Sequence, residues 1–299
     1  MLLHFQEPRL FADLPPSLLW PLTFLLGLVL RSFVNVVIAR LPAMLMLQWR
    51  AEAREALELP IEPADAELPR VTLASPRSRC PHCAHAIAWH DNIPLLGYLK
   101  RRGRCAQCRQ PISPRYPLVE LAGGALALAV VVIQGANLAS LAVIAACLTL
   151  LALAVIDLRT QLLPYLLTLP LLWGGLLYQI VFQPLLLESA VIGAMAGYLV
   201  LWAFYWLFRL VTGKEGMGYG DFKLLAALGA WVGWQMLPLL LILSAGVGAI
   251  VGILAQLMIP RLRGAPMPFG PFLAMAGWIA LLYGAPLMAI YQAFLLSTA

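Results

Sequence analysis

The sequence predicts an all-α polytopic membrane protein of about eight transmembrane helices, with a small zinc-binding insert domain on the cytoplasmic side. Three observations indicate this fold class. Of the 299 residues, 62% are hydrophobic and only 11% are charged, whereas an average soluble domain has roughly 25% charged residues. Long apolar runs recur along the chain, and each can cross about 30 Å of hydrocarbon. Two Cys-x-x-Cys pairs lie in the polar segment that follows the first run.

The predicted spans follow one another with short connections. A transmembrane helix needs roughly 17 to 25 apolar residues. Runs of this kind cover residues 17–39, 117–134, 138–157, 163–183, 187–211, 237–259 and 269–296, and a shorter stretch at 221–234 makes an eighth. The first run carries Arg31 and has no small-residue cleavage site, so we expect a permanent anchor rather than a cleaved signal peptide.

Lysine and arginine predict the orientation of these spans. The basic residues between 40 and 116, together with Arg159 and Lys214, fall in loops on one side, while the loops near 135–137, 184–186 and 235–236 have none. Cytoplasmic loops are enriched in Lys and Arg, so we expect the 40–116 segment in the cytoplasm and both termini outside. The net charge of +6 is then a consequence of topology, and we expect no nucleic-acid partner.

The charge and cysteine pattern divides the chain into three predicted parts. Residues 1–39 hold the N-terminal segment and the first span, 40–116 form the cytoplasmic insert, and 117–299 form a membrane-embedded core of about seven helices. The insert contains CPHC at 80–83 and CAQC at 105–108. Such pairs are poor disulfide candidates in a reducing cytoplasm, whereas four thiolates suit tetrahedral Zn²⁺. We expect a structural zinc site, with redox-active pairs as the alternative; its ligands are Cys80, Cys83, Cys105 and Cys108.

Two aspartates stand at the cytoplasmic border of the predicted membrane region. Asp157 ends the third span and Asp221 begins the short one, after the glycine-rich stretch KEGMGYGD. Two carboxylates at one depth suit aspartic-protease chemistry, in which the pair shares one proton. A structural interpretation stays open for each residue. Asp221 stands where a helix N-cap is expected, and Asp157 has a possible ion-pair partner in Arg159.

The quoted motifs resemble those of the type IV prepilin peptidases, the prepilin leader peptidases and N-methyltransferases of pilus assembly and type II secretion. The resemblance covers nearly the whole chain. It rests on the stretches SFVNVVIARLP, RSRCPHC, WHDNIPLLGYL, RGRCAQCRQPISPRYPLVEL, AVIDLRTQLLP, GKEGMGYGDFKLLAALGAWVGWQ and PFGPFLAMAGW.

The resemblance implies an intramembrane-type aspartic endopeptidase of the bacterial inner membrane, with Asp157 and Asp221 as the catalytic pair. It implies that the enzyme removes the basic leader of prepilins or pseudopilins after a glycine and methylates the new N-terminus with S-adenosylmethionine. The expected partners are these substrates and membrane lipid. No glycine-rich cofactor loop is visible in the sequence, so the methyl-donor site is left unassigned.

The chain departs from the family pattern at two places. Arg31 stands where a glycine is expected, and Tyr165 stands where relatives commonly have an aspartate. Two other functions remain as alternatives. A transporter or channel would place carboxylates near the bilayer midplane in repeat-related positions, whereas both aspartates lie at one face. A leader peptidase without methyltransferase activity is the second alternative.

Overall fold

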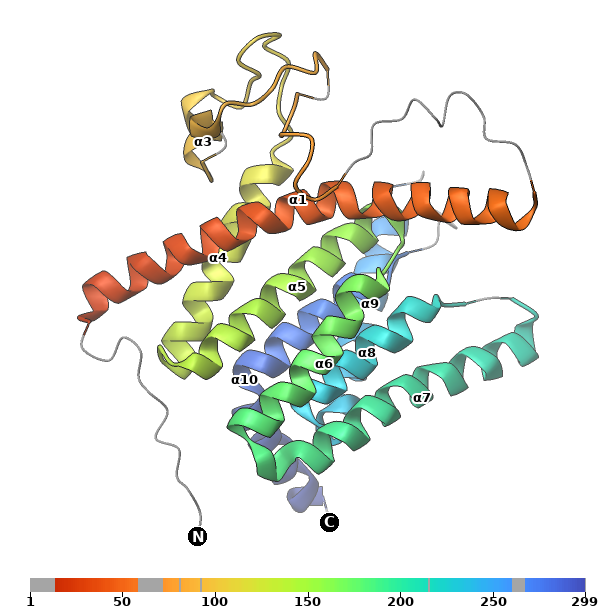
Figure 1. Cartoon of the computed structure of the whole chain (residues 1–299). Helices are drawn as coiled ribbons and strands as arrows, with labels where there is room; N and C mark the ends of the chain where they lie inside the picture. The colour runs from red at the N-terminus through yellow and green to blue at the C-terminus, as the bar shows by residue number, and fades with distance from the viewer. Residues whose placement is uncertain are drawn as a thin grey trace. The chain divides into compact units, whose positions relative to one another are not determined.

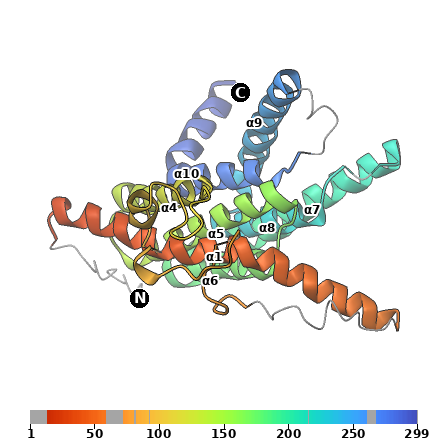
Figure 2. The ribbon, with the colours of Figure 1, turned by 90° about the horizontal axis from the view of Figure 1, so that it is seen from above.

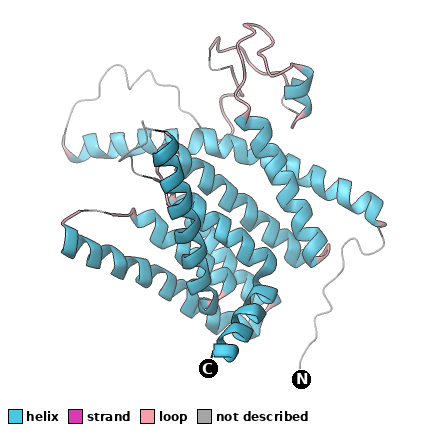
Figure 3. Cartoon of the chain, turned by 180° about the vertical axis from the view of Figure 1, so that it is seen from behind, coloured by secondary structure: helices cyan, strands magenta, loops and turns pink. Residues whose placement is uncertain are grey.

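The structure, a computed structural model, describes residues 14–58, 72–80, 82–91, 93–214, 216–259 and 267–298. These residues form helices joined by loops, and their only extended pairings are two isolated bridges, so the predicted all-α class is confirmed (Figure 3). Two compact units divide the chain, one from Pro15 to Leu128 and one from Ala129 onward. The centre of the predicted insert, 59–71, and the loop 260–266 lie outside the described residues.

The first unit contains one long helix and the small insert. Its elements are α1 (Pro16–Ala56), the 3₁₀ turn η1 (Trp89–Asp91), α3 (Leu96–Lys100) and most of α4 (Arg115–Gln134). α1 has 41 residues and continues through Pro42, well beyond the predicted end of the first span at residue 39. The residues that follow are mainly Leu, Met, Gln, Arg, Glu and Ala, which favour helix, so the first part of the predicted insert extends the helix.

The second unit is a bundle in which one short helix occupies the centre. Its elements are α5 (Leu138–Thr160), α6 (Tyr165–Phe182), η2 (Pro184–Leu186), α7 (Leu187–Thr212), α8 (Tyr219–Val232), η3 (Trp234–Met236), α9 (Leu237–Met258) and α10 (Gly270–Thr298). α8 packs against α6, α7 and α10 (Figures 1 and 2). Phe222, Leu225 and Leu228 on α8 are fully buried. A helix that is hydrophobic all round belongs in a core, and α8 has that character.

α7 and α8 approach each other closely because glycines face each other at their contact. A Cβ at Gly197 would lie 2.7 Å from the Leu225 carbonyl oxygen, and a Cβ at Gly229 would clash with the backbone of Gly193. Small residues at such positions let membrane helices meet backbone to backbone. This contact fixes the place of α8, which carries Asp221 in its first turn.

Among the described residues, six helical segments are long and apolar enough to cross a membrane, fewer than the predicted eight. They start at Pro16, Arg115, Leu138, Tyr165, Pro184 and Trp234. α8 has 14 residues, about 21 Å at 1.5 Å per residue. α10 is interrupted at Tyr283, whose backbone is non-helical, and contains Pro286. The prediction of a polytopic helical membrane protein holds, while the two remaining predicted spans correspond to shorter or broken helices.

Candidate active site and metal centre

Asp157 lies in the last turn of α5, a helix that begins with a side-chain cap and ends in a left-handed residue. At the start, the Asn137 side chain accepts a hydrogen bond from the Ser140 backbone N–H, a favourable N-cap. At the end, Gln161 has φ 54° and its N–H donates to the Asp157 carbonyl oxygen. The Asp157 side chain is only 5% exposed, so its carboxyl group faces the interior of the bundle.

Asp221 lies in the first turn of α8 and is 7% exposed. The N-cap of α8 is Gly218, which has no side chain to cap the helix. Asp221 is not the N-cap itself, but its carboxyl group hydrogen-bonds the backbone of Gly218, and a carboxylate at this position stabilises the start of a helix. One of its carboxyl oxygens, Oδ1, is buried and has no hydrogen-bond partner among the described residues. A buried polar atom without a partner is costly and is typical of a site that interacts with a substrate or water.

The start of α10 supplies the partner of Asp157. The Gly270 backbone N–H donates a hydrogen bond of 3.0 Å to Asp157 Oδ2, and this bond is buried. Arg159, the ion-pair partner that the sequence offered, is not the group that Asp157 contacts. The sequence analysis missed Gly270 as a site residue. The one signal for it was the rigid Pro-Phe-Gly-Pro-Phe motif at the start of the last apolar run.

Leu163, which follows the end of α5, lies against the starts of α8 and α10. A Cβ built at Gly220 would lie 2.7 Å from Leu163 Cβ, and one built at Gly270 would lie 3.2 Å from Leu163 Cδ2. Gly220 directly precedes Asp221, and Gly270 bonds Asp157. The two carboxyl groups also lie within range of mutual electrostatic repulsion. The fold thus brings the end of α5, the start of α8 and the start of α10 together around two buried carboxyl groups.

This arrangement suits aspartic-protease chemistry. Two carboxyl groups in one buried site cannot both ionise readily, so one proton is shared between them. The ionised member can take a proton from a water molecule, and the protonated member can polarise a scissile carbonyl group. Gly218 carries no side chain, and a Cβ there would meet no atom closer than 3.9 Å, so the backbone before Asp221 is open to the approach of an extended peptide.

The four predicted zinc ligands form a second constellation, in the first unit. The Sγ atoms of Cys80, Cys83, Cys105 and Cys108 all lie within 4.8 Å of one another. The Cys80–Cys108 and Cys83–Cys105 sulfur distances are 3.7 and 3.9 Å. Zinc–sulfur bonds of about 2.3 Å in a tetrahedron require sulfur–sulfur edges of about 3.8 Å. These two sulfur–sulfur distances match that edge, and the four thiols are close enough together to hold one zinc ion.

Each Cys-x-x-Cys pair is held by the same local turn. Cys80 N–H donates to the His85 carbonyl oxygen at 2.9 Å, and Cys105 N–H donates to the Gln110 carbonyl oxygen at 3.0 Å. Ala84 and Arg109, the residues that follow the second cysteine of each pair, both have φ 55°. The bridges Arg79↔Ala86 and Arg104↔Pro111 close the two turns. The insert thus presents two copies of one knuckle, and each copy presents two thiols.

Comparisons with known proteins identify the family of the chain. Residues 25–134 match the family model of the bacterial peptidase A24 N-terminal domain, and residues 144–253 match the type IV leader peptidase family. The chain is 55% identical to a prepilin leader peptidase/N-methyltransferase of Aeromonas hydrophila over 90% of its own length and 92% of the relative's. A protein of the same name from Stutzerimonas stutzeri is 52% identical, over 92% and 96% of the two lengths. No solved structure matches.

Proposed function

The chain belongs to the type IV leader peptidase family, and from that premise we propose that Asp157 and Asp221 are its catalytic pair. It is an enzyme that removes the leader peptide of prepilins and methylates the new N-terminus. The observation that carries the residue assignment is the meeting of two buried aspartates at the ends of α5 and α8.

In the proposed mechanism the pair acts on the peptide bond through one water molecule. One carboxylate takes a proton from the water, and the protonated partner hydrogen-bonds to the scissile carbonyl oxygen. Gly270 orients Asp157 through its N–H donor, and Gly218 hydrogen-bonds the Asp221 carboxyl group through the backbone. Leu163 packs between Gly220, which precedes Asp221, and Gly270, which bonds Asp157. This packing spaces the start of α8 from the start of α10.

The finer features of the reaction belong to the same proposal. The substrates are prepilins or pseudopilins, which are cut after a glycine that follows a basic leader. The enzyme lies in the bacterial inner membrane with residues 40–116 and the aspartates at the cytoplasmic face, because basic residues concentrate there. A substrate whose apolar segment sits in lipid then presents its leader junction at the depth of the aspartates. The methyl donor is S-adenosylmethionine.

The three parts of the chain have separate roles in this proposal. Residues 117–299 form the peptidase core, and residues 1–39 anchor the chain. The insert, 40–116, is stabilised by a structural Zn²⁺ ion on Cys80, Cys83, Cys105 and Cys108. The grouping of all four sulfurs within 4.8 Å of one another supports this assignment. A small segment of this kind gains the stability that its limited core does not supply.

Intact-mass analysis of a prepilin tests the catalytic pair. The purified enzyme in detergent is incubated with the prepilin and S-adenosylmethionine. We expect loss of the leader and gain of one methyl mass with the natural chain. The variants Asp157→Asn and Asp221→Asn should each lower the rate of cleavage by about 100- to 10,000-fold, the usual contribution of a general acid or base.

The control is Glu188→Gln, since Glu188 is an exposed carboxylate at the start of α7. This variant should cleave at the natural rate. Cleavage that persists at the natural rate in both aspartate variants would show that the pair has no catalytic role.

A further inference from the structure

A cavity of about 780 Å³ lies in the second unit, at the helix ends that are remote from the aspartates. Its walls come from the end of α4 and the start of α5, the end of α6, the residues from the end of α8 to η3, and the second half of α10. We call it the distal cavity. α5, α8 and α10 carry groups of the peptidase site at their other ends, so the same helices connect the two places.

The distal cavity lies about one membrane thickness from the aspartates. Asn137, which lines it, and Asp157 are 20 positions apart along α5. At 1.5 Å per residue this separation is about 30 Å, the thickness of the hydrocarbon core of a bilayer. In Figure 1 the turn from α6 to α7, which also lines the cavity, lies at the lower end of the bundle, whereas α5 ends towards its upper side. A polypeptide that crosses the membrane beside this unit with one end at the aspartates therefore leaves it at the level of the distal cavity.

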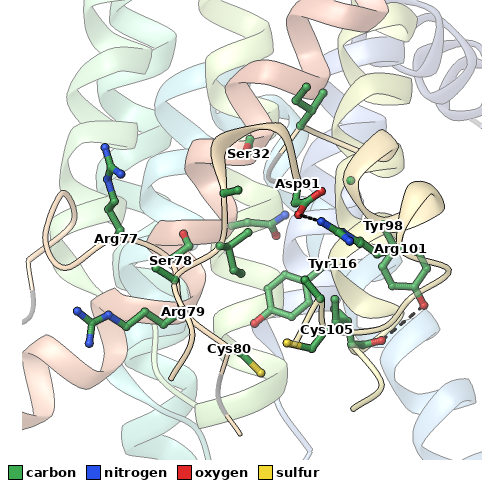
Figure 4. A pocket seen from close by; sticks show the side chains of 18 of the residues that line it. Ser32, Arg77, Ser78, Arg79, Cys80, Asp91, Tyr98, Arg101, Cys105 and Tyr116 are labelled. Atoms are coloured by element: carbon green, nitrogen blue, oxygen red, sulfur yellow. Dashed lines mark hydrogen bonds and ion pairs between the residues drawn. The ribbon is translucent and has the colours of Figure 1, made fainter. Parts of the chain in front are cut away.

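The polar lining of the distal cavity is uncharged, since none of the described residues in its walls is Asp, Glu, Lys, Arg or His. Its polar members are mainly carboxamides: Gln134, Asn137, Gln179, Gln183, Gln235 and the hydroxyl group of Ser189. A cavity in the first unit differs, because Figure 4 shows Asp91 bonded to Arg101 in its wall. An ion that entered the distal cavity would lose hydration without meeting an opposite charge. The lining therefore favours a neutral polar ligand.

Two of these carboxamides hold helices together and keep further polar groups for a ligand. Gln134 Nε2 donates a hydrogen bond of 2.9 Å to the Leu281 carbonyl oxygen, and Gln179 Nε2 donates one of 2.8 Å to the Trp231 carbonyl oxygen. Gln179 is only 3% exposed, and its Oε1 is buried without a hydrogen-bond partner among the described residues. A buried acceptor without a donor is costly. A ligand that brings an N–H or O–H group against Gln179 removes that cost.

The rest of the lining is apolar. The rings of Tyr178 and Trp231 lie 5.1 Å apart, and Ile133, Met236 and Leu282 add aliphatic surface. Ligand sites typically combine such surface with a few polar groups that fix orientation. A lining of this kind suits a stretch of polypeptide in which an apolar segment gives way to polar residues.

We propose that the distal cavity binds the substrate at a second place, about 20 residues after the cleaved bond, where its apolar segment leaves the membrane; this rests on the proposed catalytic pair. At 1.5 Å per residue, a helical segment of that length covers the 30 Å between the two places. The occupant is an uncharged stretch of polypeptide, whose peptide groups each offer one N–H and one C=O. A phospholipid headgroup fits less well, because its phosphate meets no cation among the described lining residues. Contact at both ends of the segment fixes the position of the leader junction on the aspartates.

Photocrosslinking locates this contact. Leu186, an exposed residue of the cavity wall, is replaced by benzoylphenylalanine in the full-length Asp221→Asn variant, in which the substrate stays whole. The enzyme in lipid nanodiscs is irradiated with a prepilin, digested and analysed by mass spectrometry. We expect crosslinks to prepilin residues about 15 to 25 positions after the leader junction. Crosslinks to lipid alone, or to the leader alone, would overturn the proposal.

Two adjacent leucines give a matched pair for kinetics. Leu185 and Leu186 both lie in η2 and are exposed, but only Leu186 lines the distal cavity. Leu186→Glu places a charge against an uncharged segment, so it should raise the KM for a whole prepilin by about tenfold and leave kcat unchanged. Leu185→Glu should change neither constant. With a peptide that lacks the distal segment and ends about ten residues after the cleaved bond, both variants and the natural chain should have the same KM.

The outcomes separate this inference from the proposed function. A natural KM for whole prepilin in Leu186→Glu would overturn the second contact, although cleavage by the natural chain and its loss in Asp157→Asn would still support the catalytic pair. An equal rise in KM with the shortened peptide would place the effect in the fold and contradict the contact. A lowered KM in Leu186→Glu would indicate a basic occupant and contradict the uncharged one. Cleavage at the natural rate in both aspartate variants would instead refute the proposed catalytic pair.

Discussion

At the scale of single residues, the Asp157 carboxylate depends on a backbone group 113 positions further along the chain. The N–H of Gly270 donates to Asp157 Oδ2 inside the bundle. A Cβ at position 270 would lie 2.6 Å from the same oxygen, which is far inside a normal contact distance. Only glycine fits between the end of α5 and the start of α10 in this geometry.

Gly270→Ala should therefore impair cleavage while the chain still folds. The added methyl group pushes Asp157 away from its position, and a displacement of about 1 Å costs roughly 100-fold in rate. The cleavage rate of a prepilin, measured by intact mass, checks this. Gly246→Ala on α9 is the control, because a Cβ there meets no atom within 4 Å. Natural cleavage rates in both variants would show that the Gly270 contact is not needed.

Asp91 gives a prediction about pH at the residue scale. Its pKa is lowered from 3.8 to about 2, mainly by the hydrogen bond from Arg101. A carboxyl group with a lowered pKa contributes its stabilisation above its ordinary pKa and loses it as the pH falls through the folded value. We expect amide hydrogen-exchange protection in α3 to stay constant near neutral pH and in mild acid, and to decline only from about pH 4 towards pH 2.

Asp91→Asn should reduce that protection already at neutral pH, because the charge that pairs with Arg101 and Lys100 is gone. Glu55→Gln on the exposed surface of α1 is the control and should leave α3 unchanged. Equal protection of α3 in Asp91→Asn and in the natural chain would mean that the ion pairs of Asp91 with Lys100 and Arg101 do not stabilise α3.

At the scale of elements, the two cysteine knuckles have nearly the same backbone structure. The turns 79–86 and 104–111 share their bridge, their amide-to-carbonyl bond and their left-handed residue. Each knuckle offers two thiols, so a tetrahedral metal site requires both. The zinc ion is therefore expected to join the two halves of the insert.

Zinc removal should loosen the insert and leave the bundle intact. The purified enzyme should contain one zinc ion per chain by elemental analysis. Cys108→Ala should lose it, and amide protection at 79–86 and 104–111 should fall, whereas α5 and α8 keep theirs. Cys147→Ala is the control, since Cys147 lies buried in α5 and belongs to neither Cys-x-x-Cys pair. A Cys108→Ala enzyme that retains full zinc and full protection contradicts the assignment.

α8 is shorter than a typical membrane span and is apolar along most of its length. Its 14 residues are enclosed by α6, α7 and α10. Burial on all sides allows the continuous apolar pattern that the sequence displays.

At the scale of the whole molecule, the distribution of Lys and Arg predicts which loops between helices lie on the same side of the membrane. Leu57 follows α1 and is 68% exposed, and Leu185 lies in the turn between α6 and α7 and is 90% exposed. The positive-inside rule places Leu57 in the cytoplasm and Leu185 outside.

Cysteines introduced at these two positions test the orientation in intact cells. Leu185→Cys should react with a membrane-impermeant maleimide, whereas Leu57→Cys should react only after the inner membrane is permeabilised. The natural chain, with its five cysteines, provides the background labelling. Labelling of Leu57→Cys in intact cells would reverse the predicted topology.

The sequence by itself determined the class of the protein, and it predicted the candidate aspartates and the four candidate zinc ligands. Each of these depends on local information. Apolar length predicts a membrane helix, the spacing of two Cys-x-x-Cys pairs predicts a tetrahedral site, and an aspartate at the border of an apolar run is unusual enough to identify it as a candidate. The family resemblance added the chemistry of leader cleavage and methyl transfer.

Only the tertiary structure decided which groups meet. The partner of Asp157 is a backbone N–H, and every non-proline residue carries one, so no sequence pattern selects Gly270. The same holds for Asn35, Leu95 and Glu120, which are far apart in the chain and meet only when α1, α3 and α4 pack. The extension of α1 follows instead from local helix propensity, and the break of α10 at Tyr283 lies three residues before Pro286, since a proline disrupts the helical turn that precedes it.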